Sequence, residues 1–354
     1  MTSDDPIRKV YFKSENSDKY QDMELLDIFG NKVAEGYSGT SEYSDIAYTN
    51  YSTVTQIASI QLPQGIRHIN DGAFLNIQST SNTDLIIPNG VETIGISSFE
   101  NAGITSVSFP SNPMLFGAFS FSKNPINTVT IPKTLDWDDI KQGGASAIFM
   151  DCTGNGIDLT IDEGVKAIPH NAFRNTLVNT VKFPKSLEFI GSSAFYDSNI
   201  SGDFDSAGIK QISPWAFRGA KFNSVVFRGD VEFLAPMAFA ASSSTANPCT
   251  KFVLSPNLKE CHYFGFPSYL VNCASNVVTP PNLPTLRHYA FYQYAYSANN
   301  KESLTSIIDV ELILSEGLEY IGSHAFTYAN FTNDLILPES LKYISSSSFT
   351  KMSK

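Results

Sequence analysis

Apolar residues recur along this chain in a fixed order. An aliphatic residue is followed by a second one three positions later and, five positions after that, by a phenylalanine that usually follows a small residue. The segments LEFIGSSAF (187–195), IKQISPWAF (209–217) and VEFLAPMAF (231–239) show the order at a spacing of 22 residues. Taken as an anchor, this phenylalanine recurs at twelve positions: Phe74, Phe99, Phe121, Phe149, Phe173, Phe195, Phe217, Phe239, Phe266, Phe291, Phe326 and Phe349.

The spacing of the anchors indicates an internal repeat. The intervals run from 22 to 35 residues, and four of the eleven are 22. Ten anchors have apolar residues both eight and five positions before them, whereas the stretches before Phe121 and Phe149 break this order. Such self-similarity at a period of 20 to 50 residues is typical of solenoids.

A second apolar pattern follows the anchors and predicts a short strand. In the clearest units, apolar residues stand five, eight and ten positions after the anchor and a proline follows, as in Ile104, Val107, Phe109 and Pro110. Alternation of β-branched and aromatic residues that closes on proline is typical of a half-buried strand. Each unit is therefore predicted to be one coil, made of a strand, a turn, a second extended or irregular segment, and a corner that carries the phenylalanine.

A coil of this length has no core of its own, so its inward side chains must be covered by neighbouring coils. We therefore predict a mainly β repeat solenoid of about twelve coils over residues 57–354, with a parallel β-sheet and a column of anchor phenylalanines. Residues 1–56 do not follow the register. They are predicted to form an N-terminal cap, which could include a degenerate repeat, because the end of a stack needs a polar lid.

The repeat resembles the BspA-type leucine-rich repeat family of bacterial surface proteins. LKYISSSSF, LEYIGSHAF and LEFIGSSAF match its LxxIxxxAF pattern closely, and the resemblance covers about residues 57–354. It implies a right-handed leucine-rich-repeat stack with irregular or 3-10 corners, export from the cell, and adhesion or binding to proteins. The corner Cys or Asn that is usual in the family is kept, in this alignment, only at Cys152. The resemblance brings no shared catalytic residues.

Net charge and hydropathy indicate which binding partners and which cellular locations are compatible with the chain. A net charge of -11 and a pI near 4.9 argue against nucleic acid and against an anionic membrane surface, since both select a basic protein surface. No apolar run approaches the roughly 20 residues of a membrane-spanning helix, and the start MTSDDPIRKV lacks the pattern of a secretory signal. The chain is thus expected to be cytoplasmic or a mature exported form, and the resemblance favours an extracellular or cell-surface location.

Familiar catalytic and metal-binding patterns are missing from the sequence. GxSxG, HExxH, GxGxxG, P-loop and EF-hand motifs do not occur, and the five histidines fall in separate coils, so no cofactor or metal is predicted. The four cysteines, Cys152, Cys249, Cys261 and Cys273, are predicted to be buried free thiols, with a disulfide among the last three as the alternative.

Two acidic clusters allow more than one interpretation. They are Asp136, Asp138 and Asp139 in one coil, and Asp203 and Asp205 in another. A solvated face is the plain interpretation, while closely spaced carboxylates could also bind Ca²⁺ or act as a glycosidase pair. Neither cluster has a glycine-turned calcium loop, and a solenoid coil offers no obvious enclosed cleft.

Two surfaces are candidates for binding. The first is the outer face of the parallel sheet, a polar ladder made of Ser106, Ser108, Thr128, Thr130, Thr180, Lys182 and Ser224. The second is the insertion HYAFYQYAYSANN, in which Tyr292, Tyr294 and Tyr296 could serve as contact residues or as core. We therefore predict a non-enzymatic repeat protein that binds a protein or glycan. The alternatives are an architectural spacer that presents another module, and a hydrolase that uses the Asp pairs.

Overall fold

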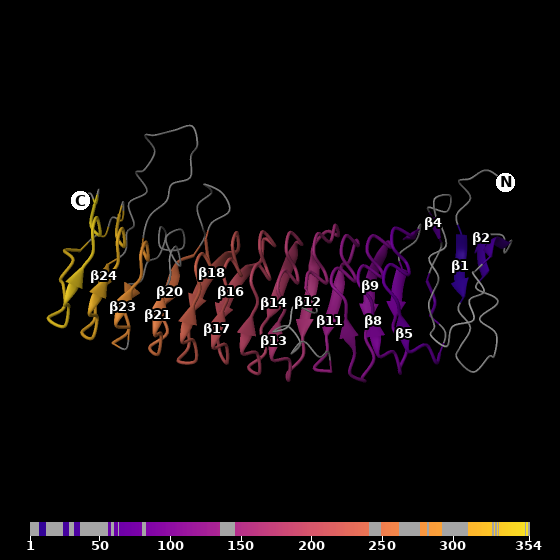
Figure 1. Ribbon diagram of the computed structural model, residues 1–354, viewed down its shortest axis with the longest axis horizontal. Helices are drawn as coiled ribbons and strands as arrows, with labels where there is room; N and C mark the ends of the chain where they lie inside the picture. Colours follow the sequence, from indigo (N-terminus) through magenta and orange to yellow (C-terminus); the bar gives the residue numbers. More distant parts are fainter. Residues whose placement is uncertain are drawn as a thin grey trace, which may run out of the picture. The chain divides into compact units, whose positions relative to one another are not determined.

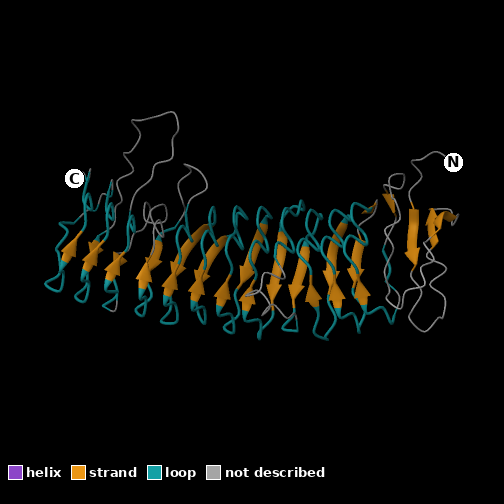
Figure 2. Ribbon diagram, in the orientation of Figure 1, coloured by secondary structure: helices purple, strands orange, loops and turns teal. Residues whose placement is uncertain are grey.

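The structure consists of strands joined by turns and loops. The computed structural model of this protein describes residues 7–11, 24–27, 32–35, 56–57, 60–62, 64–79, 83–134, 146–240, 249–261, 277–281, 283–291, 311–327, 329, 331, 333–350 and 352. Within these ranges every regular element is a β-strand and no helix occurs (Figure 2). The chain divides into two compact units, Met1–Val165 with Pro169–Lys182, and Lys166–Ile168 with Phe183–Lys354. The predicted division at residue 56 stays a prediction.

The first unit contains two parallel sheets built from successive coils (Figure 1). One has the strand order β10-β8-β5, with β5 His68–Ile69, β8 Thr93–Ile94 and β10 Leu115–Phe116. The other has the order β14-β12-β11-β9-β7, with β7 Thr83–Ile86, β9 Ile104–Ser108, β11 Thr128–Ile131, β12 Ile157–Ile161 and β14 Val178–Lys182. From β7 to β11 the strands of the two sheets alternate along the chain, which is the connectivity of a solenoid.

A third sheet of the first unit has mixed pairing and the order β3-β2-β1-β4-β6. Its strands are β1 Ile7–Tyr11, β2 Glu24–Asp27, β3 Lys32–Glu35, β4 Gln56–Ile57 and β6 Gln78–Ser79. Strands β1, β2 and β3 pair in antiparallel fashion, while β1 pairs with β4, and β4 with β6, in parallel. The antiparallel pairs explain why residues before 56 do not follow the repeat register.

The second unit repeats the two-sheet arrangement. Its longer sheet has the order β13-β15-β17-β19-β21-β23-β25-β26 and contains β13 Ala167–Ile168, β15 Phe189–Ile190, β17 Gln211–Ile212, β19 Phe233–Leu234, β21 Glu260–Cys261, β23 Thr285–Leu286, β25 Tyr320–Ile321 and β26 Tyr343–Ile344. The remaining strands are β16 Ser201–Asp205, β18 Lys221–Val226 and β20 Lys251–Val253 in one sheet, and β22 Val277–Val278 with β24 Leu312–Ile313 in another. The predicted parallel β-solenoid is confirmed.

The segment before each anchor forms a sheet of its own, which the sequence did not reveal. Each coil contributes only two residues to it, such as Phe189 and Ile190, and they pair with Gln211 and Ile212 of the next coil. The second of these residues is the buried aliphatic one that stands five positions before the anchor. Two residues are too few to produce a detectable alternation, so periodicity alone left this segment as extended or irregular.

The anchor phenylalanines form an apolar column inside each unit, as the repeat predicted. In the first unit the rings of Phe74 and Phe99 stack at 4.8 Å between centroids, and those of Phe149 and Phe173 at 5.4 Å. In the second unit Phe217 stacks on Phe195 at 5.4 Å and on Phe239 at 5.1 Å. Phe121 and Phe149 are fully buried, which confirms both anchors despite their broken upstream halves. Phe266 lies outside the described residues.

The corners around the anchors use left-handed backbone at fixed places. The residue two positions before the anchor has a φ between 52° and 64° in the described coils, and it is Gly72, Ser97, Phe119, Ala147, Asn171, Ser193, Trp215, Met237, Tyr289, His324 or Ser347. This conformation turns alternate N–H groups toward the next coil: the Ser97 amide donates to the Ala118 carbonyl and the Phe99 amide to the Ser120 carbonyl, both at 2.9 Å. The corners therefore form a backbone ladder of their own.

A buried asparagine closes one corner. The Asn124 side chain accepts from the Ala102 and Ile104 amides at 2.9 and 3.0 Å and donates to the Phe99 carbonyl at 2.7 Å. Asn124 stands three positions after its anchor, as Cys152 does in the next coil, so the corner residue typical of the repeat is kept at two places and not only at Cys152. The break in the pattern before Phe121 hid this second case.

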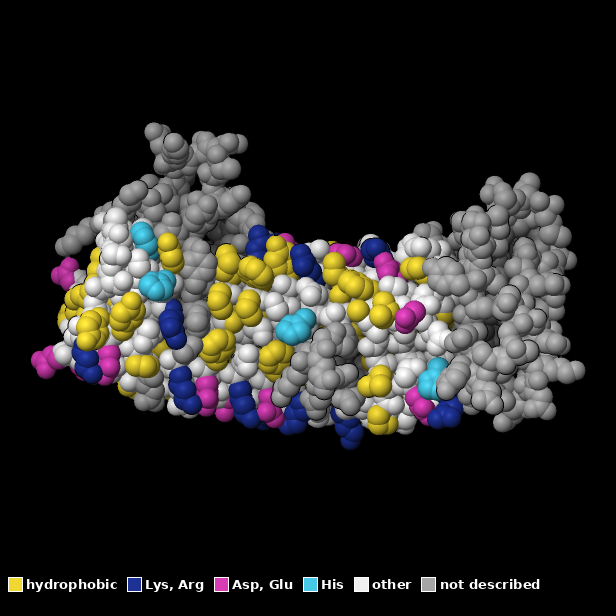
Figure 3. All heavy atoms as spheres, in the orientation of Figure 1, with side chains coloured by type: hydrophobic (Ala, Val, Ile, Leu, Met, Phe, Trp, Pro, Cys, Tyr) yellow, Lys and Arg dark blue, Asp and Glu magenta, His cyan; other side chains and the backbone are white. Residues whose placement is uncertain are grey.

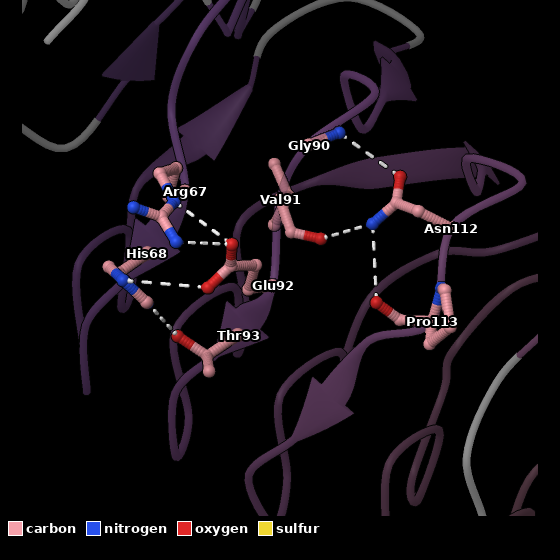
Figure 4. Close-up of polar contacts among 8 residues, drawn as sticks. All are labelled: Arg67, His68, Gly90, Val91, Glu92, Thr93, Asn112 and Pro113. Carbon is pink, nitrogen blue, oxygen red and sulfur yellow. Dashed lines mark hydrogen bonds and ion pairs between the residues drawn. The ribbon is translucent and has the colours of Figure 1, made fainter.

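Charged and polar side chains connect neighbouring coils at the edge of the short-strand sheets. Figure 4 shows the Arg67 guanidinium bonded to Glu92, and Asn112 holding the Gly90 amide and the Val91 carbonyl of the preceding coil. In the second unit the series Lys166, Glu188, Lys210, Glu232 and Lys259 alternates in charge, with ion pairs of 2.7 to 2.9 Å. Basic and acidic side chains alternate along the lower edge in Figure 3. This alternation favours the correct register between coils.

Candidate functional site

The outer face of the first unit's long-strand sheet presents short polar side chains in a regular array. In β11 the side chains of Val129 and Ile131 are buried while Thr128 and Thr130 are exposed. Strand β12 repeats this alternation, with Asp158 and Thr160 exposed. The array follows from the period of two in a strand whose other face packs on the core.

The parallel register sets these outward residues side by side on successive strands. Thr128 pairs with Ser106 on one side and with Asp158 on the other, and Asp158 pairs with Thr180. Asp84 of β7 pairs with Ser106 and completes this row. In the second row Thr130 pairs with Thr160, and Thr160 with Lys182. Six of the seven sheet residues chosen from the sequence therefore lie on one continuous surface.

A shallow depression of about 570 Å³ lies on this face, over β9, β11 and β12. Its lining is mostly hydroxyl and carboxylate side chains, and consists of Ser106, Val107, Ser108, Phe109, Thr128, Val129, Thr130, Pro132, Asp158, Thr160 and Asp162. The volume is in the range of small-molecule sites, although the depression is open to solvent and lacks the apolar enclosure of a drug-sized pocket. Thr180 and Lys182 lie beside the depression and do not line it.

Only some of the polar side chains that line the depression form hydrogen bonds within the protein. The Ser106 hydroxyl donates to Asp84 at 2.6 Å, and Asn179 donates to Asp158 at 3.2 Å. In the described part of the chain, the side-chain hydroxyls of Ser108, Thr128, Thr130 and Thr160 have no protein partner. The floor of the depression therefore offers four uncommitted hydroxyls to a ligand.

The carboxylates are the site residues that sequence reasoning missed. The polar ladder chosen from the sequence contains no carboxylate, yet Asp84, Asp158 and Asp162 all belong to this face or border it. The signal was present for two of them, because Asp84 and Asp158 stand at exposed positions of strands β7 and β12, whereas Asp162 directly follows β12. For Asp158, the long interval before Phe149 concealed the register.

Ser224 belongs to a different sheet. It lies on β18 in the second unit, where its hydroxyl donates to Asp203 of β16 at 2.7 Å. Asp205 of the same strand accepts two bonds from Arg228, from Nη2 at 2.7 Å and from Nε at 3.0 Å, and these bonds lower the pKa of the carboxyl group. Both aspartates are thus committed to contacts between coils, an arrangement that supports the interpretation as a solvated structural face.

A sequence model for the BspA type leucine-rich repeat region matches in six copies, over residues 28–143, 77–201, 144–247 and 210–354. The chain belongs to the BspA-type leucine-rich repeat family. Together the matches extend from residue 28 to residue 354 and confirm the resemblance drawn from the LxxIxxxAF segments.

Solved structures of other repeat proteins are similar to this BspA-type chain. A leucine rich cell surface protein from Faecalibacterium prausnitzii is 17% identical, with 80% of this chain and 81% of that chain covered and a TM-score of 0.40. A leucine-rich repeat protein from Eubacterium ventriosum is 14% identical, with 86% and 84% covered and a TM-score of 0.44. The pneumococcal vaccine antigen PcpA is 17% identical, with 82% and 57% covered and a TM-score of 0.35. Among curated proteins, none is similar enough to this chain to count as a match.

Several residues that the sequence singled out in this BspA-type chain lie outside the described residues. They are Tyr292, Tyr294 and Tyr296 of the insertion and Asp136, Asp138 and Asp139 of the first acidic cluster. The predictions that concern them stay predictions.

The cysteines and histidines that the structure describes do not form a site in this BspA-type protein. Cys152 and Cys249 are buried free thiols, so the disulfide considered for Cys249 is wrong. Burial raises the pKa of the Cys152 thiol to about 12, which leaves it uncharged and a poor nucleophile. Burial also lowers the pKa of His170.

The described residues lack two kinds of feature. They hold no group of three or more His, Cys, Asp or Glu side chains arranged for a metal ion. They also contain no helix with the length and apolar character needed to cross a membrane.

Proposed function

We propose that this protein is a non-enzymatic, exported surface protein that binds a protein or glycan on the outer face of the first unit's long-strand sheet. The observation that carries the proposal is the depression over β9, β11 and β12, whose floor presents four hydroxyls that have no partner among the described residues. A rigid sheet suits binding, because the side chains are held in place before a ligand arrives.

Membership of the BspA-type family supports a binding role over catalysis. The Faecalibacterium prausnitzii protein is itself described as a cell surface protein, and we propose the same location here.

The experiment is a binding screen of the purified protein against immobilised matrix proteins and a panel of glycans. The test variant is Thr130→Arg, which fills the depression with a long side chain. The matched control is Asn223→Arg, an exposed outward strand position in the second unit. Binding that is lost in Thr130→Arg and kept in Asn223→Arg is the expected outcome.

If the Thr130→Arg variant binds as well as the parent protein, the proposed binding site on this face is wrong. A parallel variant with Tyr292, Tyr294 and Tyr296 changed to alanine tests the insertion separately. Protease treatment of intact cells, followed by immunodetection of the chain, tests the proposed surface location.

A further inference from the structure

We infer that the ligand of the depression is an uncharged glycan. The inference rests on the proposed function and adds the class of ligand. It begins with the lining, where hydroxyls from Ser106, Ser108, Thr128, Thr130 and Thr160 stand beside the carboxylates of Asp158 and Asp162. A hydroxyl both donates and accepts hydrogen bonds and a carboxylate accepts them, so the surface complements a ligand that is rich in hydroxyls.

The spacing of the array also suits a chain of sugar rings. Outward residues on neighbouring strands are separated by about 4.8 Å, and those along one strand by about 6.8 Å. Thr128, Thr130, Asp158 and Thr160 therefore form a grid in which a ring-sized unit meets polar groups on two strands at once. A polymer that lies across the strands would repeat this contact from β9 to β12.

The lining also has an apolar part, made of Val107, Phe109, Val129 and Pro132. Phe109 and Pro132 are half-buried, and the Phe109 ring packs edge-on against Phe116 and Phe121. These residues offer a limited apolar wall to the C–H face of a sugar ring. Protein partners are usually bound through large aromatic or arginine anchors seated in deep pockets, and the open floor of small side chains has none.

The charge of the face decides against an anionic glycan. Asp158 and Asp162 line the depression without a lining cation, and Asp84 borders it. The basic residues beside it are Lys182, at the end of the second row, and Lys133, which follows the lining residue Pro132. An acidic sugar would lie against these carboxylates and lose its own hydration, so both repulsion and desolvation disfavour it. A neutral glycan instead gives the carboxylates hydroxyl donors.

The test is isothermal titration calorimetry of the whole protein with three probes. They are oligosaccharides of neutral sugars, oligosaccharides of uronic acids, and a soluble matrix protein. We expect heat of binding with a neutral oligosaccharide and affinity that changes little as sodium chloride is raised, because the interaction does not depend on opposite charges.

Two variants locate the interaction. Thr128→Val with Thr130→Val removes two hydroxyls without changing the shape of the strand, and we expect the neutral oligosaccharide to bind about tenfold more weakly. Asp158→Asn with Asp162→Asn should weaken the neutral ligand and reduce the discrimination against uronic acids. Ser224→Ala, on the second unit, is the control and should leave the affinity unchanged.

The outcomes separate this inference from the function on which it rests. Tighter binding of uronic acids or of the matrix protein, still abolished by Thr130→Arg, overturns the neutral-glycan inference and keeps the site. Neutral binding that survives the double valine substitution also overturns it. Loss of binding in Thr130→Arg together with neutral selectivity supports both.

Discussion

At the scale of single residues, the left-handed corner position shows how the repeat constrains the backbone while it leaves the side chain free. The residue two positions before the anchor has a positive φ in all described coils, yet its identity ranges from serine to Trp215 and Phe119, which are 43% and 39% exposed. A left-handed conformation costs an ordinary residue roughly 1 to 2 kcal/mol. The backbone ladder between coils must offset that cost, because it needs these N–H groups turned toward the next coil.

Ser97 offers a direct test of this strain. Its φ is 52°, and its amide donates to the next coil. We expect Ser97→Gly to be more stable than Ser97→Ala by up to about 1 kcal/mol, because glycine adopts this region freely, and Ser97→Val to be less stable than Ser97→Ala by about 1 to 2 kcal/mol. Urea unfolding of the three variants measures the order.

Ser108, on the exposed side of β9, is the matched control. There the backbone is extended, and the order should reverse, with valine the most stable and glycine the least. The same order at both positions would show that left-handed strain at the corner is not what sets the stability of the Ser97 variants.

At the scale of elements, the two-residue strands are held by backbone pairing and by the alternating charges at their edge. Each strand is too short to be stable alone, so its register depends on what lies to either side. Lys166 and Lys210 both bind Glu188, from opposite sides, at 2.9 and 2.7 Å. A slip by one coil would bring like charges together, and the alternation therefore selects against misaligned coils.

Glu188 gives this ladder a measurable pH dependence. The hydrogen bond from Lys210, and next the one from Lys166, lower its pKa from 4.5 to about 2. Because the folded-state pKa is depressed, the contribution of Glu188 to stability is complete above about pH 4.5 and is lost as the pH falls toward 2. Titration of the Glu188 carboxyl by NMR measures this pKa.

The Lys210→Met variant tests the cause. It removes the first partner, so the Glu188 pKa should rise toward its ordinary value. Lys259→Met is the control, since Lys259 pairs with Glu232 and does not contact Glu188. An unchanged Glu188 pKa in Lys210→Met would contradict the role assigned to the ladder.

At the scale of the whole molecule, contacts between successive coils stabilise each unit. Anchor rings stack on the rings of the coils before and after, and the anchor amides donate to carbonyls of the next coil. In such an arrangement stability is close to a sum of coil and interface contributions. A defect in one coil should therefore be felt most by its immediate neighbours.

Phe217 lies at the centre of such a group, fully buried between Phe195 and Phe239. We expect Phe217→Ala to reduce the free energy of unfolding by roughly 3 to 5 kcal/mol, because it leaves a cavity in the ring column. Phe119→Ala, at an exposed corner of the first unit, is the control and should cost about 1 kcal/mol or less.

Amide hydrogen-exchange rates measure how far the destabilisation by Phe217→Ala extends along the coils. The Phe195 amide, which donates to Ala216, should exchange much faster in this variant than in the parent protein. The Phe326 amide, farther along the second unit, should change less. Equal acceleration at both amides would rule out coupling between nearest neighbours.

The apolar repeat was enough to predict the inward-facing half of the protein. Every coil buries side chains at the same positions, so apolar residues recur there at a regular spacing. This spacing predicted the anchors, the aliphatic positions and the strand after each anchor. The same spacing indicated the BspA-type family, and it placed six polar residues correctly on the outer face of one sheet. The arrangement of the outward residues became clear only from the fold, because outward positions carry no burial constraint and so no repeating signal. Asp158 pairs with Thr128 although the anchors of their coils, Phe121 and Phe149, are 28 residues apart. Ser224, which the sequence grouped with the same face, belongs to the other unit.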